Sequence, residues 1–279
     1  DRPRQRLRAP RQPLTHRPRP TAIASATFSV RPLRTARAPR YHLPVLAPVF
    51  DLWSEAPYPG VGIVGVDVGE RVIVAAASAS EMGWDVDLAT IADPLLARIT
   101  SWIAVDGDLA ALAGRIRAFL AAIAKGAPER FPDGYPQVEA LVAVAERDAV
   151  RVWSIGGGLV QHVRDGLVIS ENRPDWLAHS RDDVVVPMPF AVISDHWASP
   201  EGVKPQLVHW RVQAGDAVVM VNGEGIRRAG WYPSPTHWPG PLTAAGVGIA
   251  LRAHYPGIRP PGMLSEPPPF AGAAAVLRW

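Results

Sequence analysis

The segment Q-A-G-D-A-V-V-M-V-N-G-E-G-I, residues 213–226, decides the fold class of this 279-residue chain. Ala214-Gly215-Asp216 predicts a tight turn, because glycine and aspartate favour turn conformations. The apolar run Ala217–Val221 predicts a buried strand that follows the turn. The strand then ends in a glycine-rich tip that carries the carboxylate of Glu224. Many α/β enzymes present an acidic ligand at such a strand end, so we expect a functional site here.

The composition is that of a globular protein rich in turns, with 48% hydrophobic residues, 30 prolines and 24 glycines. The chain has no cysteine, which excludes disulfides, thiolate metal sites and a cysteine nucleophile. No apolar run is long enough to span a membrane, and the first residues lack the apolar core of a signal peptide. We therefore expect a cytoplasmic protein with no membrane span.

Positive charge is concentrated in residues 1–40, which hold 11 arginines and one acid, a net charge of about +10. The whole chain carries +3, so residues 41–279 carry −7. Repeated proline and arginine repulsion predict a flexible basic arm before a domain at 41–279. Three interpretations of the arm stay open: an electrostatic tether to nucleic acid or to an acidic protein surface, a transit-like leader, or translation from a start codon set too early.

From about Tyr41 the sequence has the pattern of a globular domain, with short apolar runs that predict strands. Three segments instead have the helical period, and they begin at Asp93-Pro94, at Asp108 and at Leu242. Asp106 or Asp108 is expected to cap the second of these helices. The predicted strands are 61–68, 71–77, 138–146, 149–155, 159–164, 167–170, 207–212, 217–221 and 273–279. This segregation predicts an α+β sandwich of two antiparallel sheets with flanking helices.

Three segments in this order resemble the metal-dependent serine/threonine phosphatases of the protein phosphatase 2C (PPM) family. Residues 138–166 resemble the central meander of that family, in which a strand ends in Gly-Asp-Ser. Residues 207–226 are similar to the segment where Gly-Asp leads into an apolar strand that ends in Asp-Gly, and residues 273–279 resemble the terminal strand. The resemblance implies an α-β-β-α sandwich and two Mg²⁺ or Mn²⁺ ions that activate water for phosphate hydrolysis.

The acidic positions implied by the resemblance are mostly replaced in this chain. The Asp of Gly-Asp-Ser falls at Gly157, and the terminal Asp-Asn falls at Ala271-Gly272. The strand-end Asp-Gly falls at Asn222-Gly223 or at Glu224-Gly225, and the early metal loop retains only Glu81 as an acid. Two adjacent divalent ions with so few carboxylates would repel each other strongly.

We therefore expect a pseudophosphatase, which is a non-catalytic or regulatory domain that binds a protein partner and needs no cofactor. An alternative is an active phosphatase or hydrolase that uses Mg²⁺ or Mn²⁺ held by relocated acids. The candidate metal ligands are Glu81, Glu224, Asp67 and Asp85. A third hypothesis is a nucleic-acid-associated protein that acts through residues 1–40.

Tryptophans in proline-containing segments are the candidates for a partner-binding surface. These are Trp176, Trp197, Trp231 and Trp238. Aromatic side chains on loops are frequent in binding surfaces, but they equally pin long loops to a domain. Both interpretations stay open from the sequence.

Overall fold

Two five-stranded antiparallel sheets form the centre of the computed structural model. The structure describes residues 47–55, 61–80, 89–129, 137–172, 205–222, 235–238, 241–254 and 270–279. The first sheet has the order β1 (Val49–Glu55), β10 (Gly272–Arg278), β9 (Ala217–Val221), β6 (Leu159–Arg164), β7 (Leu167–Glu171). The second has the order β2 (Val61–Val68), β3 (Arg71–Ser80), β4 (Gln137–Ala145), β5 (Ala149–Ile155), β8 (Gln206–Arg211).

Tight turns set the pairing of neighbouring strands. β6 and β7 are joined by Asp165 and Gly166, with φ angles of 51° and 78°. Two-residue hairpin turns favour such positive φ values because their twist matches that of the strands, and Asp-Gly adopts them readily. The hairpin predicted at these two residues is therefore confirmed, with Arg164 opposite Leu167.

In the described ranges three helices flank the sheets, and each buries an apolar stripe. They are α1 (Ala89–Asp106), α2 (Leu112–Gly126) and α4 (Ala244–His254). The start predicted for the first helix at Asp93-Pro94 is wrong by four residues, since Pro94 lies inside α1. The second helix begins at Leu112, four residues after the predicted start, and its N-cap residue Ala111 makes no side-chain capping bond. The Asp108 carboxylate instead accepts hydrogen bonds from the N–H groups of Ala110 and Ala111 in the turn before α2.

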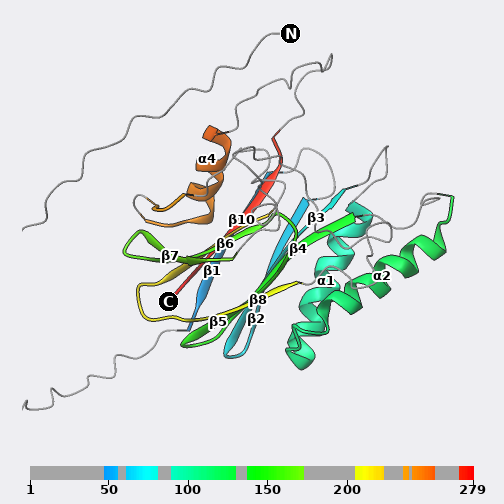
Figure 1. Cartoon of the computed structure of the whole chain (residues 1–279), viewed down its shortest axis with the longest axis horizontal. Helices are drawn as coiled ribbons and strands as arrows, with labels where there is room; N and C mark the ends of the chain where they lie inside the picture. Colours follow the sequence, from blue (N-terminus) through cyan, green and yellow to red (C-terminus); the bar gives the residue numbers. More distant parts are fainter. Residues whose placement is uncertain are drawn as a thin grey trace, which may run out of the picture. The chain divides into compact units, whose positions relative to one another are not determined.

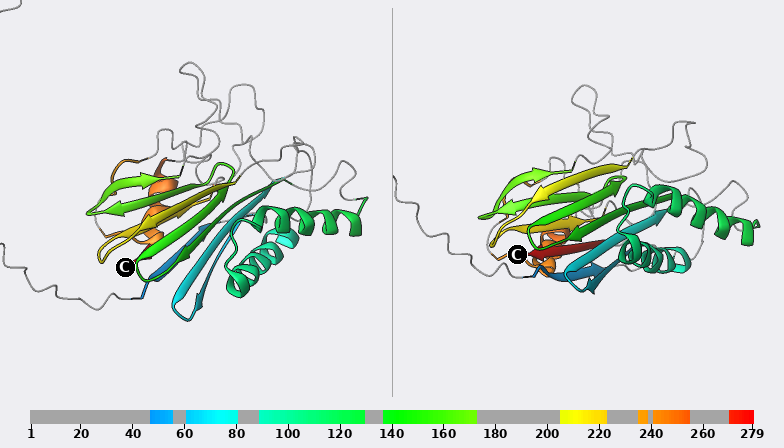
Figure 2. Two further views of the ribbon diagram at one scale, coloured as in Figure 1. Left: turned by 60° about the horizontal axis from the view of Figure 1, so that its bottom comes forward. Right: turned by 90° about the horizontal axis from the view of Figure 1, so that it is seen from below.

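Figure 1 shows α1 and α2 beside the second sheet and α4 beside the first sheet. Three apolar layers fill the spaces between these elements. Ile73, Val142 and Trp153 face α1 and α2 from the second sheet. Val74 and Met220 belong to the layer between the two sheets. A third layer lies between the first sheet and α4. The order helix, sheet, sheet, helix confirms the predicted sandwich, and Figure 2 shows it from two further directions.

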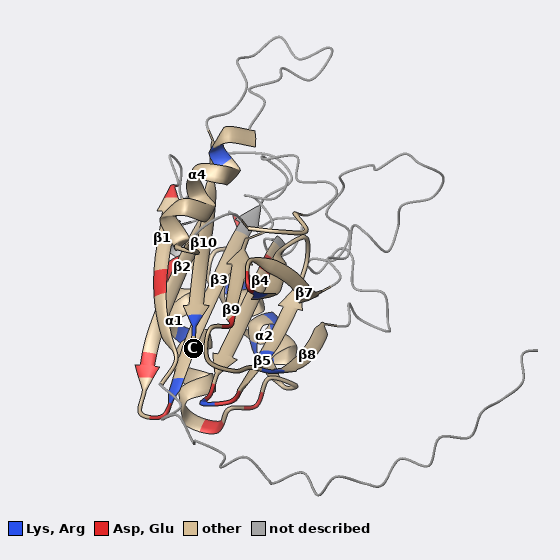
Figure 3. Cartoon of the chain, turned by 90° about the vertical axis from the view of Figure 1, so that its left-hand side faces the viewer, with Lys and Arg blue, Asp and Glu red and all other residues tan. Residues whose placement is uncertain are grey.

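The first strand is a feature that the sequence did not predict. β1 pairs along its whole length with β10, from Val49 opposite Arg278 to Glu55 opposite Gly272. The described residues all belong to one compact unit, His42–Trp279, whereas the basic arm lies outside the described residues. Among the helices in the described ranges, none is long and apolar enough to cross a membrane. Figure 3 shows charged residues mainly at strand ends and turns.

Candidate functional site

One end of the sandwich gathers polar side chains from both sheets. Ser78 near the end of β3 lies opposite Glu139 near the start of β4. Asn222 follows β9 directly and lines the same narrow gap as these two residues. All three are buried, with exposed fractions of 6% for Ser78, 4% for Glu139 and 1% for Asn222. The gap leaves no space for a water molecule.

Asn222 is used to extend the ladder between two strands. Its side-chain Oδ1 accepts a hydrogen bond of 2.7 Å from the N–H of Ala273. Its own N–H donates a bond of 3.0 Å to the carbonyl of Ala273. Both main-chain groups of the buried Ala273 are thereby satisfied by one residue, as buried main-chain groups require.

Asn172 makes the same two bonds at the end of β7. Its Oδ1 accepts a bond of 2.7 Å from the N–H of Val160, and its N–H donates a bond of 3.0 Å to the carbonyl of Val160. The side-chain Nδ2 donates to the carbonyl of Gly158 at 2.9 Å and to the hydroxyl of Ser154 at 3.3 Å. Asn172 therefore ties β7 to the connection between β5 and β6.

Glycines in that connection make room for the side chains of β4. Gly156 has a φ of 95°, and a Cβ at this position would lie 2.4 Å from Cγ of Glu139. A Cβ at Gly158 would lie 2.7 Å from Cδ1 of Leu141. Glu139 and Leu141 thus occupy the space into which a larger side chain at either glycine would project.

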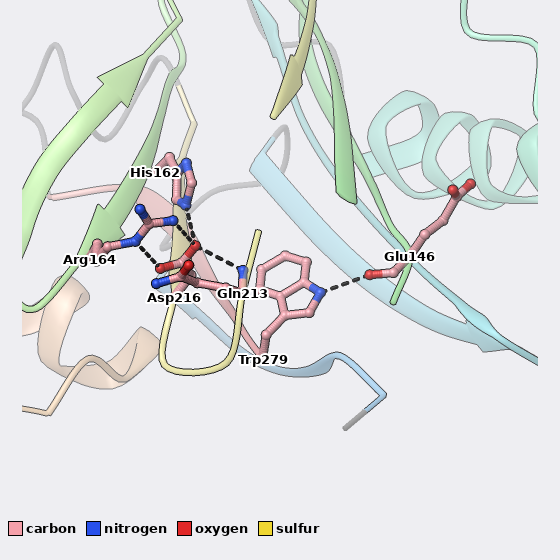
Figure 4. Close-up of polar contacts among 6 residues, drawn as sticks. All are labelled: Glu146, His162, Arg164, Gln213, Asp216 and Trp279. Atoms are coloured by element: carbon pink, nitrogen blue, oxygen red, sulfur yellow. Dashed lines mark hydrogen bonds and ion pairs between the residues drawn. The ribbon is translucent and has the colours of Figure 1, made fainter. Parts of the chain in front are cut away.

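A second polar cluster lies at the opposite end of β9 (Figure 4). The buried carboxylate of Asp216 accepts hydrogen bonds from Arg164, from His162 and from the N–H of Gln213. The His162 ring stacks on Trp210, with the ring centroids 5.8 Å apart. Burial by itself raises the pKa of Asp216, but the hydrogen bonds from Arg164, His162 and Gln213 outweigh it and hold that pKa below its ordinary value.

The geometry of this second cluster indicates that it stabilises the fold. Every partner of Asp216 is a donor that satisfies the carboxylate within the fold. Trp279 lies beside it, and its indole N–H donates to the carbonyl of Glu146 in the turn between β4 and β5. The cluster therefore fixes the turn Gln213–Asp216 and links the two sheets at this end (Figure 4).

Solved structures with the same architecture are serine/threonine phosphatases. The S. agalactiae serine/threonine phosphatase aligns over 83% of this chain and 99% of its own, with 11% identity and a TM-score of 0.61. The catalytic domain of PstP, in complex with two manganese ions, aligns over 83% and 97%, with 14% identity and a TM-score of 0.50. PppA from Pseudomonas aeruginosa aligns over 84% and 98%, with 14% identity and a TM-score of 0.50.

This chain has the protein phosphatase 2C fold. The resemblance expected from the sequence is confirmed at the level of the fold, which is what likeness at such low identity shows. No protein-family model matches the sequence, and no curated protein matches it.

The described residues at the strand ends do not fit the two divalent cations that the phosphatase 2C fold implies. Mg²⁺ and Mn²⁺ prefer oxygen ligands, and Mg²⁺ usually retains several waters. Here one carboxylate, that of Glu139, lines a gap without room for water. Within the described ranges, no three acidic or histidine side chains gather to hold a metal ion.

Asp67 does not belong to this end of the phosphatase 2C fold. It lies exposed on β2 opposite Val72 of β3, whereas Ser78 lies six residues further along β3. At about 3.3 Å per residue, this separation is roughly 20 Å. The described residues therefore do not bring Asp67 together with Ser78, Glu139 and Asn222. Glu81, Asp85 and Glu224 lie outside the described residues.

Trp238 is buried in the apolar layer between the first sheet and α4. Its exposed fraction is 6%, and its indole N–H donates to Oε1 of Gln161 at 3.0 Å. This burial and this hydrogen bond favour the interpretation that Trp238 pins its segment to the domain. Trp176, Trp197 and Trp231 lie outside the described residues.

Glu139 is the site residue that our reading of the sequence missed. It lies in β4 (Gln137–Ala145), in phase with Leu141 and Ala143, which face the layer between the sheets. Strand alternation therefore places its carboxylate toward the interior. An acid in phase with core residues was the signal that could have found it.

Proposed function

We propose that this chain is a phosphatase-like domain that does not hydrolyse phosphate esters and acts by binding a protein partner. The observation that supports the loss of catalysis is the use of Asn222 at the strand end. At Asn222, one of the two positions where the resemblance places a metal-binding aspartate, the side chain is committed to the main chain of Ala273. Metal-assisted hydrolysis needs a cation, its oxygen ligands and a water in one place.

The surroundings of Asn222 support the same proposal. Gly157 stands where the resemblance implies a second aspartate, and it is buried. Glu139 and Leu141 fill the space beside Gly156 and Gly158. A single substitution does not recreate the ligand set, because both the carboxylates and the volume for water are replaced.

A regulatory, partner-binding role is supported by the retained scaffold. The two five-stranded sheets, the described helices and the Asp216 cluster are present, although the described strand ends carry no set of metal ligands. PppA, which has a similar fold, is described as a key regulatory component of T6SS. We propose residues 1–40 and the segments 176–197 and 231–237 as the docking elements, since the basic segment complements an acidic partner surface.

The catalytic half of the proposal is tested by incubating the full chain with Mn²⁺ and a phosphoserine peptide. We expect no phosphate release above the rate without protein. Release that Glu139→Gln or Glu224→Ala abolishes, and that Asp67→Asn leaves intact, would overturn the proposal in favour of relocated ligands. Asp67→Asn is the matched control because Asp67 is exposed on β2 and lies opposite Val72, six residues along β3 from Ser78.

The binding half is tested by purifying tagged chain from cells with its associated proteins. We expect a partner that is lost on deletion of residues 1–40 or in Trp176→Ala, Trp197→Ala and Trp231→Ala. Val105→Ala is the control, because Val105 is 83% exposed on α1 and away from these segments in sequence. If nucleic acid copurifies in place of a protein, and is lost on deletion of residues 1–40, the result would favour the nucleic-acid hypothesis.

A further inference from the structure

The two asparagines of this chain are used in the same way. The 279-residue sequence contains only Asn172 and Asn222. Each accepts a bond of 2.7 Å through Oδ1 from the N–H of one residue on the neighbouring strand. Each donates its own N–H, over 3.0 Å, to the carbonyl of that same residue. The shared geometry is that of an antiparallel ladder extended by one residue, with a side-chain oxygen in place of a main-chain one.

Both asparagines act at one end of the first sheet. Asn222 closes the pair β9–β10 on Ala273, and Asn172 closes the pair β6–β7 on Val160. β6 and β9 are themselves adjacent, with Leu159 opposite Val221. Four consecutive strands of the sheet are thus closed at the end where the phosphatase 2C fold implies bound cations.

We infer that Asn172 and Asn222 form a protein-only clamp that holds these strand ends without divalent cations, so that the stability of the domain does not depend on such ions. Both residues are 1% exposed, so water does not compete for their bonds. The gap beside Asn222 has no space for water, and a cation would have to displace the side chain from Ala273. The clamp concerns how the fold is held and is independent of the proposed partner binding.

The chemistry of the amide matters most at Asn172. Its Nδ2 donates to the carbonyl of Gly158, so a carboxylate oxygen at that position would face another oxygen. Asn172→Asp is therefore expected to destabilise the domain, although it changes no volume. Asn222→Asp retains an oxygen that accepts from Ala273 and is expected to keep that bond.

The clamp is tested by calorimetry and amide hydrogen exchange on the full chain. We expect the same Tm with Mn²⁺, with Mg²⁺ and with EDTA. Asn222→Ala should lower Tm by roughly 2–10 °C and remove exchange protection at Ala273, while Val160 stays protected. Asn172→Ala should also lower Tm, but it should remove the protection at Val160 and leave Ala273 protected. Gln213→Ala, which truncates an exposed amide, is the control and should change neither.

Two results would overturn the inference. One is a rise of Tm with Mn²⁺ that Glu139→Gln removes, because a ligand that binds the folded state stabilises it. The other is undiminished protection at Ala273 in Asn222→Ala. If Asn222→Ala does not fold, Asn222→Asp is measured instead, and loss of protection at Ala273 in that variant contradicts the clamp. Phosphate release with an unchanged Tm would defeat the proposed function alone.

Discussion

Arg164 and Asp216 form a two-point ion pair that joins β6 to the start of β9. Nε of Arg164 lies 2.7 Å from Oδ1 of Asp216, and Nη2 lies 2.8 Å from Oδ2. The carboxylate is fully buried, whereas the guanidinium side chain is 36% exposed. Paired hydrogen bonds of this kind fix orientation as well as charge.

Asp216→Asn should destabilise the domain by about 2–4 kcal/mol. The substitution removes the buried negative charge that neutralises Arg164. Partial exposure of Arg164 keeps the loss below that of a fully buried pair. The change is measured by urea denaturation. Asp148→Asn is the control, since Asp148 and Arg211 form an exposed pair, and it should cost less than about 1 kcal/mol. Equal losses in both variants would contradict the role of burial.

The stability of the wild-type domain should fall in acid through Asp216. The pKa of Asp216 is held below its ordinary value of 3.8, so the folded state binds a proton less readily than the unfolded state. The stabilisation is present above the unfolded pKa and is lost as the pH falls through the lower, folded pKa. Denaturation curves between neutral pH and about pH 2 should therefore show the gap between wild type and Asp216→Asn closing below about pH 4. A gap that stays constant over this range would refute the linkage.

Trp238→Phe should cost about 1–3 kcal/mol, because it leaves the oxygen of the buried Gln161 without the indole N–H. The loss is read from chemical denaturation. A double-mutant cycle with Gln161→Ala isolates the pair, and we expect a coupling energy of at least about 0.5 kcal/mol. Additive losses would show that the hydrogen bond contributes nothing beyond packing.

Gly248→Ala and Gly114→Ala should act in opposite directions on the stability of the domain. A Cβ at Gly248 in α4 would lie 2.2 Å from the Trp53 ring, so overpacking should cost about 3 kcal/mol. A Cβ at Gly114 in α2 meets nothing within 4 Å, so the higher helix propensity of alanine should stabilise by about 0.5–1 kcal/mol. Both shifts are measured as changes in Tm. Trp53→Leu should relieve the first variant and have no effect on the second.

The local elements of this fold follow from short-range patterns in the sequence. The Asp165-Gly166 hairpin and the strand Ala217–Val221 are found where turn chemistry and apolar runs predicted them. β1 was missed because its alternation is interrupted by polar residues and its partner lies in residues 272–278. Tertiary pairing overrides weak local preference in such a strand.

The site was harder to predict from the sequence than the fold, because the role of each site residue depends on partners that are distant in the chain. The sequence placed Asn222 at a strand end, but its bond to Ala273 arises from a segment about fifty residues away. The position of Asp67 relative to Ser78 follows only from the register of β2 with β3, which places Asp67 opposite Val72. Trp238 occurs in a proline-rich segment, and its burial follows from the contact with Gln161 on β6.

The position of β10 between β1 and β9 has a consequence for synthesis on the ribosome. β2, β3, β4 and β5 are consecutive in both the chain and the second sheet, so this sheet can assemble while translation continues. The first sheet is completed later, because Val49 pairs with Arg278 and β10 is the last of the described strands to be synthesised. Until then β1 and β9 both present open edges, and the nascent chain is exposed to misassembly that a chaperone would prevent.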